Sequence, residues 1–187
     1  MRTTPAEIRY PYNEDGYEWC RPVDREFILH RAKLINGESR AAGWQPIEVY
    51  ISHKRMKDGA PLKYSDSPFM DSKVLILRER AIAALGPMLL QYGELLPLKC
   101  NEAELRLYNV TNVLPALHEE ASGAEVDEDG NIRRISQYVF RKNVVGENDI
   151  FKLKNRPLCP ILLTHRFVEL WRSCGLQGLE FKYPGTY

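Results

Sequence analysis

Residues 161–182 read ILLTHRFVELWRSCGLQGLEFK and contain the clearest structural pattern in the 187-residue chain. Ile161–Leu163 form a short apolar run of strand length, and Thr164 is a residue type favoured at helix N-caps. Apolar side chains then recur at helical spacing, at Phe167, Val168, Leu170, Trp171 and Cys174. Gly175 fits the C′ position of a Schellman motif, and residues 178–182 alternate between apolar and polar side chains. The stretch therefore predicts a buried strand, an amphipathic helix and a second strand.

The elements expected before this stretch do not alternate regularly between strand and helix. Apolar spacing over residues 81–92 predicts a helix, with a kink or restart at Gly86-Pro87. Asn112 is expected to cap a short helical turn that ends at Leu117, and Phe151–Lys154 is expected to be a half-exposed strand. Further strands are expected at residues 47–51, 74–77, 94–98, 105–110 and 132–141. These elements favour the α+β class, with a mainly antiparallel sheet, a few helices packed on it, and a single domain.

Composition argues against several classes of protein. The 26 Lys and Arg residues against 25 Asp and Glu residues give a net charge of +1, unlike a uniformly basic nucleic-acid coat or an acidic disordered tail. No apolar run is long enough for a membrane helix, and the N-terminal segment lacks the apolar core of a secretory signal. The four cysteines include no CxxC pair, which argues against a zinc site and a disulfide scaffold. We therefore expect a cytoplasmic protein without a metal or another cofactor.

No motif in the sequence marks a catalytic site. The chain has neither a GxSxG elbow nor a Gly-rich phosphate loop. Cys100 is the cysteine best placed for exposure, but nothing beside it indicates an activated thiol. We therefore name no catalytic residues. An enzyme acting on a small substrate stays open as an alternative, because a pocket with converging polar groups is not visible in a sequence.

Charge is distributed unevenly along the chain. Residues 119–129 form an acidic loop, and Asp129-Gly130 at its end predicts a hairpin turn. Its carboxylates are the candidate partner-binding groups: Glu119, Glu120, Glu125, Asp127, Glu128 and Asp129. A dense group of carboxylates attracts a basic partner and speeds its docking.

Basic residues gather in three other places, one of which is Arg78 with Arg80. His53-Lys54-Arg55, with Lys57, follows the strand expected at residues 47–51. The third group lies on the predicted strand 132–141, which also carries aromatic side chains, and on the residue after it: Arg133, Arg134, Arg141 and Lys142. Arginines and aromatic rings on one sheet face can bind single-stranded nucleic acid, so a nucleic-acid-binding regulator is a further alternative.

Two longer motifs resemble a known family. Tyr92–Leu98 reads YGELLPL and Tyr108–Val113 reads YNVTNV. Both are similar to motifs of the immunity proteins of bacterial polymorphic toxin systems, in the family numbered eleven, formerly a domain of unknown function. Similarity continues at residues 135–140, 151–153 and 164–181, and weaker similarity lies upstream at residues 17–19 and 22–24. The resemblance is best over residues 72–187 and weaker over residues 1–71, within a single domain of residues 1–187.

The resemblance implies a cytosolic antidote that binds a cognate toxin domain and blocks it stoichiometrically, without enzymatic activity. If that toxin is a nuclease, its active site must be basic, and the acidic loop could mimic phosphates. A groove lined by Tyr12, Tyr17 and Trp19 is a second candidate surface. Neither nucleic acid nor a membrane is then the expected partner, and the sequence predicts no oligomeric state.

Overall fold

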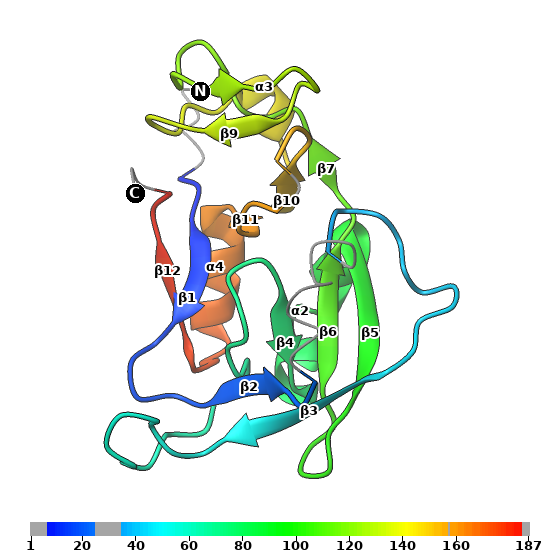
Figure 1. Ribbon diagram of the computed structural model, residues 1–187. Helices are drawn as coiled ribbons and strands as arrows, with labels where there is room; N and C mark the ends of the chain where they lie inside the picture. Colours follow the sequence, from blue (N-terminus) through cyan, green and yellow to red (C-terminus); the bar gives the residue numbers. More distant parts are fainter. Residues whose placement is uncertain (1–6, 25–34, 157, 185–187) are drawn as a thin grey trace.

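The computed structural model describes residues 7–24, 35–156 and 158–184. Within these residues the chain forms three α-helices and twelve β-strands, and most strand pairs are antiparallel (Figure 1). The predicted α+β class with mainly antiparallel pairing is confirmed. The strands do not form one continuous sheet, because they divide among one five-stranded, one three-stranded and two two-stranded sheets.

The largest sheet has the strand order β2-β3-β5-β6-β4. Its strands are β2 (Trp19–Pro22), β3 (Ile47–Ser52), β4 (Leu75–Leu77), β5 (Gly93–Lys99) and β6 (Arg106–Val110). All neighbours are antiparallel except β3 and β5. In β3 the side chains of Val49 and Ile51 are buried, whereas those of Glu48 and Tyr50 are exposed. One face of this strand therefore packs on the core, as its alternating sequence predicts.

Helix α2 (Glu79–Tyr92) packs on this sheet through buried side chains that include Leu85 and Leu89. Pro87 lies inside the helix without interrupting it, so the helix does not restart there. Strand β5 follows directly at Gly93. A Cβ atom on Gly93 would lie 2.4 Å from the backbone oxygen of Asn109 on β6, so only glycine permits this close approach.

The C-terminal unit forms as its sequence predicts, with β11 (Leu162–Leu163), α4 (His165–Ser173) and β12 (Leu179–Lys182). The N–H of Gly175 donates to the oxygen of Arg172, and the N–H of Leu176 donates to that of Trp171. These are the two bonds of a Schellman motif. Thr164 occupies the N-cap position, but its hydroxyl bonds to the Asp149 carboxylate instead of capping the helix. Strand β12 then pairs with β1 (Tyr10–Asn13).

Two predictions are wrong around β10 (Ile150–Leu153), which pairs with β11 and with β7 (Val113–Leu114). Residues 113–114 are a strand and not a helical turn, because the Asn112 amide donates to Ile150 across the sheet rather than capping a helix. Strand β10 is wholly buried and not half-exposed. Its polar residue Lys152 lies inside the protein, with Nζ 2.6 Å from the backbone oxygen of Ile35.

The predicted hairpin forms from β8 (Glu125–Val126) and β9 (Ile132–Arg134), which are antiparallel. The strand expected over residues 132–141 is too long, since β9 ends at Arg134 and α3 (Lys142–Val145) follows. Phe140, between them, turns toward the core and packs edge to face on Phe151, with ring centroids 6.2 Å apart.

Candidate functional site

The predicted acidic loop folds into a turn organised by one carboxylate. Asp127 Oδ1 accepts the backbone N–H groups of Asn131 at 2.7 Å and Asp129 at 3.1 Å. The Asn131 bond and, after it, the Arg133 guanidinium lower the pKa of Asp127. Gly130 closes the turn with a φ of 79°, a conformation that favours glycine. We call residues 119–134, the loop together with the hairpin, the acidic hairpin.

Antiparallel pairing places the arginines of β9 beside the carboxylates that precede them in sequence. Arg133 Nε lies 2.6 Å from Asp127 Oδ2, and Arg134 lies 3.6 Å from Glu125. Two of the six candidate carboxylates are therefore neutralised within the hairpin. A third, Glu119, is partly buried and accepts a hydrogen bond from Asn155 at 3.3 Å.

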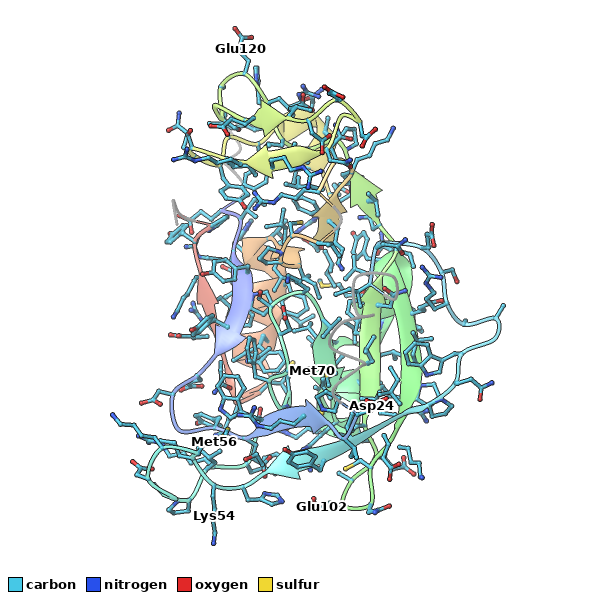
Figure 2. All side chains as sticks on the ribbon, viewed as in Figure 1. Asp24, Lys54, Met56, Met70, Glu102 and Glu120 are labelled. Carbon is cyan, nitrogen blue, oxygen red and sulfur yellow. The ribbon has the colours of Figure 1, made fainter. Side chains whose placement is uncertain are left out.

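The other three candidates, Glu120, Glu128 and Asp129, are exposed and form no ion pair with the described residues. Figure 2 shows Glu120 pointing outward at one extreme of the molecule. These three carboxylates are the part of the predicted site that can meet an incoming positive charge. Glu128 and Asp129 lie on the turn held by Asp127, whereas Glu120 lies on the preceding turn, where its backbone oxygen accepts the Gly123 N–H at 3.0 Å.

A hollow of about 310 Å³ lies beside the acidic hairpin. It is lined by Asn131, Ile132, Arg133, Asn155, Arg156 and Leu158. Leu158 is 42% exposed, and Val126 on the neighbouring strand is 45% exposed. The surface thus combines unpaired carboxylates with accessible apolar side chains, a combination that can give both attraction and burial on binding.

The arrangement of arginines and aromatic rings expected on strand 132–141 does not form. Arg133 and Arg134 face carboxylates, and Arg141 and Lys142 lie beyond the end of β9. The ring of Tyr138 stacks on that of Phe140, which packs inward. The four cations therefore do not share one sheet face with the aromatic rings.

The three residues of the second candidate surface are placed differently. Tyr17 is buried, whereas Trp19 and Tyr12 flank Phe69, with centroid distances of 5.3 and 5.8 Å. Tyr12 is 43% exposed, and the Lys182 ammonium lies 3.6 Å from its ring centroid. Packing on Phe69 thus accounts for Trp19, while Tyr12 presents one face to solvent.

The cysteines do not mark a reactive site. Cys20 and Cys159 are buried, and burial raises the pKa of the Cys20 thiol to about 12 and that of Cys159 above its usual value. Cys100 is partly buried. Across the described parts of the chain, His, Cys, Asp and Glu side chains nowhere gather in a group of three that could hold a metal ion. None of the helices formed by those parts is long and apolar enough to span a bilayer.

Residues 102–185 match the model of the immunity protein family Imm11. The predicted resemblance is therefore confirmed over this segment, which we call the Imm11 segment. It covers somewhat less than half of the chain and contains the whole acidic hairpin and the C-terminal unit. No curated protein matches the chain.

The YGELLPL motif precedes the Imm11 segment and supports it through one carboxylate that sequence analysis did not single out. Glu94 accepts hydrogen bonds from Ser39 Oγ at 2.7 Å, from the Arg40 N–H at 2.5 Å and from the Ala41 N–H. Asn109, inside the Imm11 segment, donates to Glu94 at 2.8 Å and to the Glu38 oxygen at 2.9 Å. Burial opposes ionisation, but these hydrogen bonds outweigh it and lower the pKa of Glu94.

The motif residues of β5 and β6 therefore serve mainly to hold the fold. Glu94 and Asn109 face each other in the β5–β6 register and together fix the loop at residues 38–41. Tyr108 supports the same junction by donating its hydroxyl to the Leu89 oxygen of α2 at 2.9 Å. The signal in the sequence was the motif itself, in which a glutamate and an asparagine sit among apolar strand residues.

Proposed function

We propose that this protein is a cytoplasmic immunity protein that binds a cognate toxin domain and blocks it stoichiometrically, without catalysis of its own. The match of residues 102–185 to the Imm11 immunity family supports this proposal. An inhibitor of this kind requires a stable scaffold and a partner-specific patch. Both can be supplied by the sheets of the Imm11 segment and by the hairpin that they carry.

The patch that we propose is the acidic hairpin, and the class of toxin that fits it best is a nuclease. A nuclease site must be basic to hold phosphates, and Glu120, Glu128 and Asp129 present unpaired negative charge on two hydrogen-bonded turns. Carboxylates at the edge of an interface mainly raise the association rate. The apolar side chains of Val126 and Leu158, next to them, can supply burial.

The test is co-expression with a toxin domain encoded beside this gene, followed by measurement of growth rescue and of the Kd of the complex. Replacing the three carboxylates (Glu120→Gln, Glu128→Gln, Asp129→Asn) should weaken binding by about tenfold or more at low salt, mainly through slower association. A control triple variant (Glu104→Gln, Glu147→Gln, Glu169→Gln) removes equal charge from exposed positions elsewhere and should bind normally. An unchanged Kd for the hairpin variant would remove this patch, and lack of rescue by the wild type would remove the toxin-neutralising function.

A further inference from the structure

A second charged surface lies outside the Imm11 segment. Residues 53–63 read HKRMKDGAPLK, and we call them the basic loop. Its charged side chains are Lys54, Arg55, Lys57, Asp58 and Lys63, so cations outnumber carboxylates by four to one. The carboxylate of Asp58 lies 3.8 Å from Arg55, while Lys54 and Lys57 are exposed and form no ion pair with the described residues.

The basic loop also exposes an apolar side chain at its tip. Met56 is 81% exposed, more than any other large hydrophobic residue in the described chain. It lies in the turn between Arg55 and Lys57, so a methionine stands among cations. Apolar side chains left this accessible often belong to binding surfaces.

The loop is held in shape by its own backbone and by a polar base. The Arg55 N–H donates to the Ala60 oxygen at 2.8 Å, and the Leu62 N–H donates to the His53 oxygen at 2.8 Å. His53, at the base, lies between two carboxylates, with Nδ1 2.9 Å from Glu18 and Nε2 2.6 Å from Glu102. The exposure of Met56 is thus set by an ordered turn.

The basic loop and the acidic hairpin lie at opposite ends of the molecule. Figure 2 shows Lys54 and Met56 at one end and Glu120 at the other. Because the net charge of the chain is only +1, two copies repel each other weakly at long range. Two copies arranged head to tail bring opposite charges together, whereas a contact between two loops or between two hairpins places like charges together.

We propose that the basic loop of one copy docks on the acidic hairpin of a second copy. In this arrangement Lys54 and Lys57 face Glu120, Glu128 and Asp129, and Met56 enters the hollow beside the hairpin. That hollow, with a volume of about 310 Å³, has room for a methionine side chain, and Ile132 and Leu158 give it apolar walls. The lysines thus match the unpaired carboxylates in charge, and Met56 matches the hollow in size.

Two other groups bear on this contact. Arg133 is already paired with Asp127, so it adds little net repulsion toward the loop. Arg156 lines the hollow and has no carboxylate partner among the described residues, so it opposes the approach of the lysines. The proposal thus predicts that Arg156→Glu strengthens self-association.

A contact of this kind joins two different surfaces and leaves a free hairpin and a free loop at the ends of every assembly. Further copies can therefore add at both ends, so the size of the assembly increases with protein concentration. Growth stops only if the copies close into a ring. If the proposed function also holds, self-association and toxin compete for the acidic hairpin. The immunity protein would then be released from its assemblies by its toxin.

The experiment is sedimentation equilibrium of the full chain over a range of concentrations, at about 0.01 M and about 1 M salt. At low salt the average mass should rise with concentration above the 21.6 kDa of one chain, and at high salt it should return to that mass. Met56→Ala and Lys54→Gln/Lys57→Gln should each weaken self-association by about tenfold. The controls Leu90→Ala, at another exposed apolar residue, and Lys142→Gln/Arg172→Gln, with an equal charge change, should not weaken it.

A chain that stays monomeric at low salt up to millimolar concentration would overturn the proposal, and so would self-association that Met56→Ala does not weaken. A loop that binds a random oligonucleotide or anionic vesicles through Lys54 and Lys57, in a protein that does not self-associate, would assign it to that partner instead. Failure here is distinct from failure of the proposed function. If only self-association fails, the Met56→Ala variant should still rescue growth from the toxin. If the wild type self-associates but does not rescue growth, the proposed function fails and the self-association proposal remains.

Discussion

The ion pair beneath the basic loop and the ion pair in the acidic hairpin have similar lengths in very different surroundings. Arg78 lies 2.9 Å from Glu18, and Arg133 lies 2.6 Å from Asp127. The Glu18 and Arg78 side chains are only 6% and 14% exposed, whereas Arg133 is 72% exposed. Distance alone therefore says little about energy. Breaking the buried pair should strongly destabilise the fold, because it leaves an uncompensated buried charge. Breaking the exposed pair should change stability little, so side chains of the hairpin can be used for binding.

Removing the buried carboxylate gives the largest effect expected from this comparison. Glu18→Ala leaves the Arg78 guanidinium without its carboxylate and removes the acceptor of the Ser65 N–H. We expect a loss of about 3–5 kcal/mol in the free energy of unfolding, measured with urea. Glu125→Ala, which breaks the exposed pair with Arg134, should change it by about 0.5 kcal/mol or less. Similar losses for the two variants would contradict the role given to burial.

Lys152 extends the comparison to a buried charge without a carboxylate hydrogen-bonded to it. Burial lowers the pKa of Lys152 to about 8, below the value of about 10.4 for an exposed lysine. Between pH values of about 8 and about 10.4, Lys152 is protonated in the unfolded chain but deprotonated in the folded one. The free energy of unfolding therefore rises with pH over this range. The rise should total about 3 kcal/mol.

The measurement compares urea unfolding of the wild type and Lys152→Met from about pH 7 to pH 10.5. Cys20, with its raised pKa, acts in the opposite direction in both proteins and cancels in the difference, which reports Lys152 together with its electrostatic coupling to Cys159. The variant should be the more stable protein at pH 7 and lose its advantage at high pH. A constant difference across the range would mean that the fold does not lower the pKa of Lys152.

His53 should give the smallest effect, because its side chain is 52% exposed. Hydrogen bonds to Glu102 and then Glu18 raise the pKa of His53. Its stabilising contribution is therefore complete below the unfolded value of about 6.5 and is lost as pH rises through the raised folded value. His53→Gln should lower Tm at acidic pH and reduce the fall of Tm above neutrality. His165→Gln, at an exposed histidine on α4, serves as the control. Equal dependence of Tm on pH in the two variants would contradict a stabilising role for the His53 contacts with Glu18 and Glu102.

The elements that could be predicted from sequence are those in which local pattern and tertiary packing agree. The C-terminal strand, helix and strand are one case, since Gly175 and the apolar face through Trp171 specify helix end and buried side together. Strand β10 is the opposite case. Its alternation of apolar residues with lysines suggested one solvated face. Lys152 is instead buried, and its ammonium donates a hydrogen bond to the backbone oxygen of Ile35, more than a hundred residues away in the sequence. Such long-range cover leaves no mark in the local pattern.

The candidate site shows the same division. The turn at Asp129-Gly130 was predictable from local chemistry, and so was the clustering of carboxylates. Linear sequence suggested adjacent patches of opposite sign, whereas pairing of β8 with β9 places Arg134 opposite Glu125 and cancels part of both. The carboxylates left unpaired are a consequence of strand register, which only the three-dimensional structure specifies.

The direct junction between α2 and β5 restricts where this chain can change length. The helix ends at Tyr92 and the strand begins at Gly93, so no linker residue can absorb an insertion. One extra residue would move every β5 side chain to the opposite face, which would expose Leu96 and draw Glu94 away from the loop it holds. Insertions, tags and fusions are therefore best tolerated away from this junction, at solvent-exposed turns such as that around Gly43, where added side chains meet open space.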